Sequence, residues 1–217
     1  MVTPERARAL ELNWQALLAE INNRARLLVV SKTRSADEIR YLYQLGQRDF
    51  GENRVQELEE KALLLSDLPA LRWHLIGPLQ SNKVAKLKKI AGLSAVHSVG
   101  SLALLGKMQN AVERPLDLYL QVNTSREDAK SGFEDFASLK EAASAVSGPL
   151  RLKGLMTMAT FRTDDPAGEA RRCFRELREL RDRLDPGLEL SMGMSGDYPI
   201  ALEEGTHWVR VGGKIFA

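Results

Sequence analysis

"LLVVSKTRSADEIRYLYQLG", residues 27–46, holds one complete strand–helix unit. Residues 27–30 are a short, uninterrupted apolar run, which is typical of a strand that is buried on both faces. The tetrapeptide "SADE" at 35–38 is a capping box, and apolar residues at helical spacing continue from it until the helix stops near Gly46. A buried strand that leads into an amphipathic helix predicts an α/β fold.

The same alternation runs through the chain. Strands are predicted at 27–31, 48–51, 71–77, 94–99, 116–122, 152–158, 188–194 and 207–216. Helices are predicted at 4–23, 35–46, 55–65, 81–91, 101–113, 134–147, 165–185 and 197–204. Alternation of this kind means parallel strands joined by right-handed crossovers.

About eight such units, with no linker or change of composition between them, predict a single (β/α)8 TIM-type barrel that spans residues 1–217. The chain opens with a helix and closes with a strand, so the first helix would cover the gap beside the last strand. A doubly wound open sheet is the alternative fold, but no G-x-G-x-x-G sequence follows the first strand.

The composition is that of a globular protein with 44% hydrophobic and 28% charged residues. A net charge of +2 with scattered basic residues gives no support to a nucleic-acid partner. The one cysteine, Cys173, allows no internal disulfide. No apolar run approaches the ~20 residues of a membrane span, and the N-terminus has no signal-peptide pattern, so we expect no membrane association and a cytoplasmic location.

Polar and glycine residues stand at the ends of most predicted strands, where a barrel places its active site. They are Lys32, Asn53, His74, Gly77, His97, Ser98, Asn123, Met156, Thr157, Ser195, Gly196, Arg210, Gly212 and Gly213. Each alone is weak evidence, because a lysine after a strand is usually a solvated surface residue and a strand histidine is usually a hydrogen-bonded structural group. No two of the three histidines have metal-ligand spacing, so no metal site is predicted.

The last two strand ends suggest a phosphate site. "MGMSGD" (192–197) places Gly and Ser just before a helix, and "VRVGGK" (209–214) has two adjacent glycines after a strand. Barrels often bind phosphate at these two loops through backbone N–H groups and a helix N-terminus. The alternative is that the glycines only make tight turns. Strand alternation should point Arg210 into the same cavity.

A lysine buried in a partly apolar barrel mouth would favour its neutral, nucleophilic amine. Across from a phosphate cradle, Lys32 could form a Schiff base with a phosphorylated carbonyl compound. Two chemistries fit: an aldolase that acts on a sugar phosphate, and a lysine that holds pyridoxal 5′-phosphate (PLP).

The whole chain resembles the PLP homeostasis family, whose barrel is similar to that of alanine racemase. The matching stretches are "VSKT" (30–33), "FGENRVQE" (50–57), "WHLIGPLQSNK" (73–83), "VHSV" (96–99), "QVNTSREDAKSGF" (121–133), "GLMTM" (154–158), "LSMGMSGDYPIALEEGTHWVRVG" (190–212) and "IF" (215–216). The resemblance implies a fold-type III barrel with PLP joined to Lys32. It also implies ring contacts from Asn53 and His74, a phosphate site at Ser195, Gly212 and residue 213, and Arg210 facing the pyridine nitrogen.

The family usually has Thr or Ser where this chain has Gly213, so we expect weaker binding of the phosphate. The implied role is to hold and deliver PLP in vitamin B6 homeostasis, with apo PLP-dependent enzymes as possible partners, as a monomer or weak homodimer. No catalytic residue is expected, since an arginine that only donates would leave the ring nitrogen unprotonated and make PLP a poor electron sink. The alternative is a small PLP-dependent racemase or decarboxylase.

Overall fold

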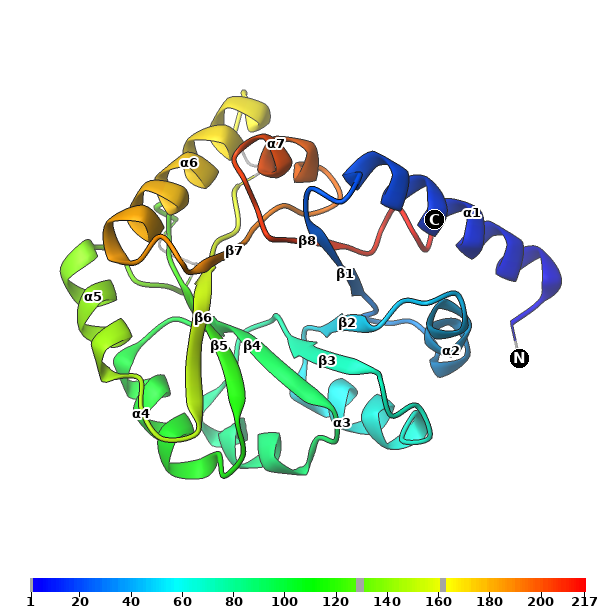
Figure 1. Ribbon diagram of the computed structural model, residues 1–217, viewed down its shortest axis with the longest axis horizontal. Coiled ribbons are helices and arrows are strands. Elements are labelled where there is room, and N and C mark those ends of the chain that lie inside the picture. The colour runs from blue at the N-terminus through cyan, green and yellow to red at the C-terminus, as the bar shows by residue number, and fades with distance from the viewer. Residues whose placement is uncertain (1, 128–130, 161–162) are drawn as a thin grey trace.

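Eight parallel strands close into a barrel in the order of the sequence, as a computed structural model describes for residues 2–127, 131–160 and 163–217 (Figure 1). The strands are β1 (Arg26–Val30), β2 (Asp49–Glu52), β3 (Arg72–Leu75), β4 (Leu93–Val99), β5 (Leu116–Gln121), β6 (Leu150–Met156), β7 (Glu189–Ser191) and β8 (Trp208–Val211). Strand β8 pairs with β1 from Arg26↔Trp208 to Val29↔Val211 and so closes the ring. The predicted (β/α)8 barrel is confirmed, and the open doubly wound sheet is excluded.

Helical segments surround the strands. They are α1 (Pro4–Ile21), α2 (Ala36–Gln44), α3 (Val55–Leu64), η1 (Ser81–Lys89), α4 (Leu102–Ala111), α5 (Phe136–Ala145), α6 (Pro166–Leu184) and α7 (Tyr198–Glu203). The predicted capping box is present, since the Ser35 hydroxyl accepts from the Glu38 backbone N–H and the Glu38 carboxylate accepts from the N–H of Ser35. Helix α1 lies against the β8–β1 side of the barrel in Figure 1, where the Asn13 amide donates to the Ile215 carbonyl at 3.2 Å.

Several predicted strands are shorter in the structure, such as β7, and two predicted elements differ most. Residues 81–89 form a 3-10 helix where an α-helix was predicted over 81–91. Its buried residues, Val84, Leu87 and Ile90, recur every three positions, which suits three residues per turn. The last strand ends at Val211, because the chain turns at Gly212, whose carbonyl accepts from the N–H groups of residues 215 and 216.

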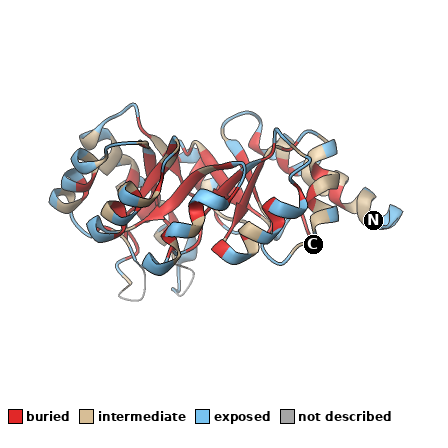
Figure 2. Cartoon of the chain, turned by 90° about the horizontal axis from the view of Figure 1, so that it is seen from below, coloured by how far each residue is buried: buried red, intermediate tan, exposed pale blue. Residues whose placement is uncertain are grey.

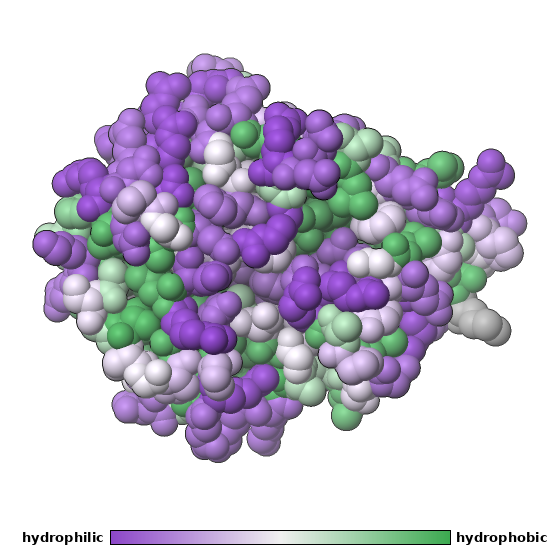
Figure 3. Space-filling model, viewed as in Figure 1, coloured by the Kyte–Doolittle hydropathy of each residue, from purple (hydrophilic) through white to green (hydrophobic). Residues whose placement is uncertain are grey.

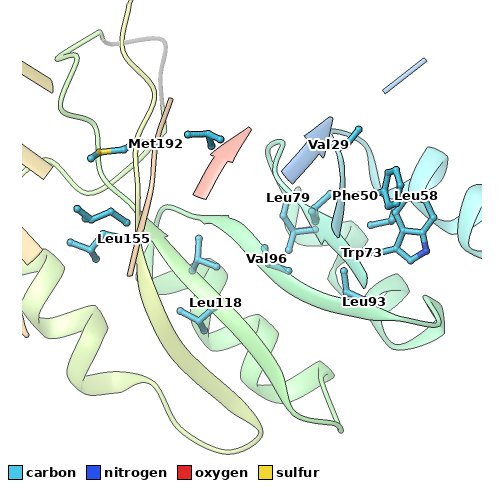
Figure 4. Close-up of a cluster of buried hydrophobic side chains, with 14 of the residues drawn as sticks. Val29, Phe50, Leu58, Trp73, Leu79, Leu93, Val96, Leu118, Leu155 and Met192 are labelled. Carbon is cyan, nitrogen blue, oxygen red and sulfur yellow. The ribbon is translucent and has the colours of Figure 1, made fainter. Parts of the chain in front are cut away.

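The main core lies between the strands and the helices. Figure 4 shows part of it, with Val29, Phe50, Trp73, Val96 and Leu118 contributed by successive strands. Seen edge-on in Figure 2, most strand residues are buried, whereas the helices are buried mainly on the side that meets the strands. This outer core fixes the position of each strand and therefore of each strand end.

A second, smaller cluster fills the interior of the barrel. Its apolar members are Leu28, Ile76, Ala95, Tyr119, Met156 and Trp208. Polar side chains share this space, and His74, His97, Ser191 and Arg210 are all buried. The barrel interior is therefore a packed core with a polar line through it, not a pore.

Hydrophilic residues cover most of the rim of the face seen in Figure 3, with apolar areas between them. Among the described residues, no helix combines the length and apolar character that crossing a bilayer requires.

Candidate functional site

A cavity of about 380 Å³ opens at the C-terminal ends of the strands, within the usual size range of small-ligand sites. Its lining comes from β1 and β8 and from the loops that follow strands. The residues are Val30, Lys32, Thr33, Arg34, Asn53, Ile76, Gly77, Pro78, Met158, Met194, Ser195, Arg210, Gly212 and Gly213. Six of the seven residues predicted for the site line this one cavity. The seventh, His74, does not.

Lys32 lies at the mouth of the cavity and is exposed, not buried as the sequence argument supposed. Within the described residues its ammonium group has no hydrogen bond or ion pair. The backbone turns sharply here, with Thr33 in the left-handed region at a φ of 62° and the Arg34 N–H donating to the Ser31 carbonyl at 3.0 Å. A β-branched residue at positive φ is strained, so other contacts must hold this turn.

Those contacts come from a buried ion cluster centred on Lys61 of α3. Its Nζ donates to the Ser31 carbonyl at 2.7 Å, to Glu52 Oε1 at 2.8 Å and to Glu57 Oε1 at 2.7 Å. Glu57 Oε1 also accepts from the strained Thr33 N–H at 2.6 Å. Burial raises the pKa of Glu52, and the bonds from Lys61 and Ser31 only partly oppose that rise. The cluster fixes the backbone on both sides of Lys32.

Sequence reasoning missed this cluster, although part of its signal was visible. The stretch "FGENRVQE" carries Glu52 and Glu57, and Lys61 follows Glu57 by four residues on the same helix. Nothing in the sequence shows that these three charges turn inward beneath the Lys32 turn.

The two glycines at the end of β8 have different roles. A Cβ on Gly212 would lie 2.5 Å from the Val30 carbonyl oxygen, so only glycine lets β8 approach β1 this closely. A Cβ on Gly213 would meet only Ser195, at 3.4 Å from its Oγ, and neither glycine has a positive φ. The Ser195 hydroxyl makes no hydrogen bond within the described residues. This corner therefore offers a hydroxyl that makes no hydrogen bond in the described part of the chain and a glycine backbone that no Cβ covers.

Arg210 forms the floor of the cavity and is only 4% exposed. Its Nη1 donates to Ser191 Oγ at 2.9 Å and its Nη2 donates to the Thr157 carbonyl at 2.8 Å. Burial lowers the pKa of Arg210 to about 10, and the charge of Asp197 opposes the change. At neutral pH the guanidinium stays charged and can only donate hydrogen bonds.

His74 lies one layer deeper in the barrel than the residues that line the cavity, and its contact with the ligand stays a prediction. Its Nδ1 is 3.0 Å from His97 Nε2, and its Nε2 is 3.1 Å from Asp49 Oδ1. The physical reason is the strand period of two: Ile76, two residues further along, points into the same interior and occupies the level of the cavity.

Burial beside other cations should make His97 a source of acid sensitivity. Burial, then His74 and Arg210, lower the pKa of His97 well below its usual value. The unfolded chain therefore binds a proton that the folded protein excludes, so stability is lost as the pH falls below ~6.5. The free energy of unfolding, measured in urea between pH 7.5 and 5.5, should fall less steeply with decreasing pH for His97→Gln than for the wild type. Equal slopes would contradict this assignment.

Other polar residues at strand ends are occupied in structural bonds. The Ser98 hydroxyl donates to the Gly77 carbonyl at 2.7 Å, and the Thr157 hydroxyl donates to the Val122 carbonyl at 2.8 Å. The Asn123 amide donates to the Glu127 carbonyl at 3.0 Å. None of these three residues lines the cavity.

The arrangement at the cavity has three chemical parts. An unpaired primary amine stands at the mouth, a hydroxyl and glycine backbone form one corner, and a buried guanidinium forms the floor. These parts fit a small ligand with a carbonyl group for the amine and a negative charge for the hydroxyl corner. The far end of its ring would carry a hydrogen-bond acceptor for the guanidinium.

Comparison with known proteins identifies the family. The family model of the alanine racemase N-terminal domain matches residues 6–217. The pyridoxal phosphate homeostasis protein of Pseudomonas aeruginosa is 44% identical over 196 residues, which are 88% of this chain and 83% of that protein.

Solved structures agree in fold. PipY of Synechococcus elongatus, solved with PLP bound, is 37% identical and superposes with a TM-score of 0.83 over 96% of this chain and 100% of PipY. Alanine racemase of Corynebacterium glutamicum has a TM-score of 0.73 over 96% of this chain and 61% of that enzyme. Its identity of 16% shows a common fold and nothing further.

Proposed function

This chain belongs to the pyridoxal phosphate homeostasis protein family, and from that premise we propose that it holds PLP in the barrel-mouth cavity as a Schiff base on Lys32. The observation that carries the proposal is the unpaired Lys32 amine in one cavity with Ser195 and Arg210. Condensation of the Lys32 amine with the PLP aldehyde forms a C=N bond and releases one water. PLP supplies the aldehyde, the pyridine ring and the phosphate; the protein supplies the groups that hold each.

Residues of this chain fit the cofactor at every part. The Ser195 hydroxyl and the backbone N–H groups of residues 212 and 213 would hold the phosphate. Arg210 would donate to the pyridine nitrogen, and Asn53 at the cavity wall would contact the ring. His74 is bonded to Asp49 and His97 below these residues, and its ring contact stays a prediction.

The phosphate should supply most of the non-covalent affinity. Pyridoxal, which lacks the phosphate, should bind at least about a hundredfold more weakly, because two or more charge-assisted hydrogen bonds of ~1.5–3 kcal/mol each are lost. Gly213→Thr should tighten PLP binding by restoring a hydroxyl beside Ser195, since its backbone has no positive φ. The control is Gly212→Ala, which should weaken binding because its Cβ collides with the Val30 carbonyl. Equal affinity for pyridoxal and PLP would refute the phosphate assignment.

We further propose that the protein carries and releases PLP, with apo PLP-dependent enzymes as acceptors, and does not turn over amino acids. Arg210 supports this role, because a donor at the ring nitrogen opposes its protonation and weakens PLP as an electron sink. The exposed Lys32 also leaves its bond to PLP open to attack by a free amine or an acceptor's lysine.

The test of the carrier role mixes PLP-loaded protein with an apo PLP-dependent enzyme in the presence of a scavenger for free PLP. Recovery of that enzyme's activity is the expected result. Racemisation and decarboxylation of alanine, serine, lysine and arginine are assayed in parallel. Turnover at ~1 per second or more, abolished by Lys32→Ala, would replace the carrier role with that of a small PLP-dependent racemase or decarboxylase.

A further inference from the structure

A continuous line of hydrogen bonds runs through the barrel interior from the cavity floor to the opposite end. We call it the interior chain; its members are Arg210, Ser191, His97, His74 and Asp49. Successive contacts are 2.9 Å from Arg210 Nη1 to Ser191 Oγ, 2.8 Å from Ser191 Oγ to His97 Nδ1, 3.0 Å from His97 Nε2 to His74 Nδ1 and 3.1 Å from His74 Nε2 to Asp49 Oδ1. Each member comes from a different strand.

The arginine end of the interior chain sets its first link. Arg210 can only donate, so Ser191 Oγ accepts from it, and the hydroxyl hydrogen of Ser191 can point to His97 Nδ1. With His97 Nδ1 as the acceptor, neutral His97 carries its hydrogen on Nε2, where it donates to His74 Nδ1.

The carboxylate end requires the same direction. His74, with Nδ1 accepting, carries its hydrogen on Nε2 and donates to Asp49 Oδ1. The reverse direction would place a lone pair of His74 against the Asp49 carboxylate. Burial would raise the pKa of Asp49, but donation by Arg72 and His74 outweighs it and the pKa is lowered, so the carboxylate stays ionised.

The surroundings keep His97 neutral and hold both imidazoles in place. His97 is fully buried, stacks on Tyr119 of β5 at a centroid distance of 4.1 Å, and feels the charges of Arg210 and Arg26 from β8 and β1. His74 faces Asp49 from β2, His97 from β4 and the edge of Trp208 from β8. Burial, His74, Arg210 and Arg26 all lower the pKa of His97, so a proton added there is opposed.

We propose that Ser191, His97, His74 and Asp49 are positioning residues that aim the Arg210 guanidinium at the pyridine nitrogen of bound PLP. This inference rests on the proposed PLP site. Ser191 and the Thr157 carbonyl take one N–H from each terminal nitrogen of Arg210, which fixes the plane of the guanidinium. The remaining N–H groups are then presented from a fixed position, and the interior chain holds Ser191 in its accepting orientation.

The decisive experiment compares PLP with its analogue in which a CH group replaces the ring nitrogen. Wild-type protein should bind PLP more tightly than the analogue. Ser191→Ala removes the acceptor of Arg210 and should weaken PLP binding by about tenfold, as expected for a lost bond to a charged group, while the analogue changes by less than about twofold. In this variant, the pH dependence of the absorbance band of bound PLP should also change.

A second variant acts four links away from Arg210 and has a matched control. Asp49→Asn keeps the size of the side chain but weakens the anchor of His74, and should reduce the preference for PLP over the analogue by about threefold. Asp117→Asn is the control, because Asp117 pairs with Arg151 across β5 and β6 as Asp49 pairs with Arg72 across β2 and β3, but it contacts no histidine. Asp117→Asn should leave the preference unchanged.

The outcomes separate this inference from the proposed function. Loss of PLP and analogue binding by equal factors in Ser191→Ala, or an unchanged preference in Asp49→Asn, would reduce the interior chain to a structural role. Equal affinity of the wild type for both compounds would remove Arg210 from the ring nitrogen and overturn the inference, yet leave PLP binding intact. Wild-type protein that binds neither compound would instead refute the proposed PLP site. If Ser191→Ala does not fold, Asp49→Asn decides.

Discussion

Lys32→Ala will yield a protein that shows no near-violet absorbance band with PLP and no stable adduct after borohydride reduction. The Schiff base needs a primary amine at the cavity mouth, and within the described residues Lys32 is the one lysine that lines this cavity. Ser195, Arg210 and the glycine backbone remain in place in the variant, so weak non-covalent binding of PLP should persist. Absorbance titration and peptide mapping of the reduced wild-type protein measure the two effects.

The matched control for this experiment is Lys83→Ala. Lys83 lines a neighbouring cavity that shares Asn53 and Pro78 with the first, so it stands near the site without entering it. This variant should keep the absorbance band and the reducible adduct. Recovery of the label on Lys83 or Lys214 in place of Lys32 would show that the assignment is wrong.

Lys61→Met will lower the free energy of unfolding by about 3–5 kcal/mol at neutral pH, out of a total of about 5–15 kcal/mol for a typical domain. Methionine fills a similar volume but leaves the fully buried Glu52 without its cation, and Glu52 Oε2 already has no hydrogen-bond partner. The same change releases the Ser31 carbonyl and frees Glu57, which holds Thr33. Weaker PLP binding should therefore accompany the loss of stability. Urea unfolding and PLP titration measure the two.

Lys86→Met is the control that separates the effect of burial from the effect of losing an ion pair. Lys86 bridges Glu59 at 2.7 Å, the same length as the Lys61–Glu57 bond, but the two side chains are 39% and 31% exposed. A pair of this kind contributes about 0–1 kcal/mol, because water screens it and solvates either charge when the other is removed. If both methionine variants lost the same stability, the buried cluster would not be what holds the Lys32 turn.

The barrel was predictable because each strand–helix unit shows its character locally. Residues 27–46 contain a buried strand, a capping box and an amphipathic helix, and the structure has all three. The 3-10 helix at 81–89 was not predictable from its amphipathic pattern, since a spacing of three fits both helix types over so short a length. The loop "NTSREDAKSGF" lies partly outside the described residues.

The sequence predicts which strand ends converge on the candidate site. It does not predict how deep in the barrel each side chain lies. Lys32, Ser195 and Arg210 share the cavity because they follow or end neighbouring strands of a closed ring. His74 lies on the inward face of β3 one layer below the cavity, and strand alternation alone does not distinguish two layers of one face. The sequence shows Glu57 and Lys61 four residues apart, but the inward placement of the cluster depends on long-range packing of α3 against β1 and β2.

The interior chain also carries a net electric dipole. Its hydroxyl and imidazole groups are dipoles aligned head to tail, like the peptide units of a helix, and aligned hydrogen bonds polarise one another. The negative end of this column meets the guanidinium of Arg210, and its positive end meets the carboxylate of Asp49. A cation at the cavity floor is thus stabilised from the far end of the barrel, where Arg72, half-exposed to solvent, completes the pair with Asp49. An anion that enters the mouth therefore meets a positive charge that the barrel interior stabilises from below.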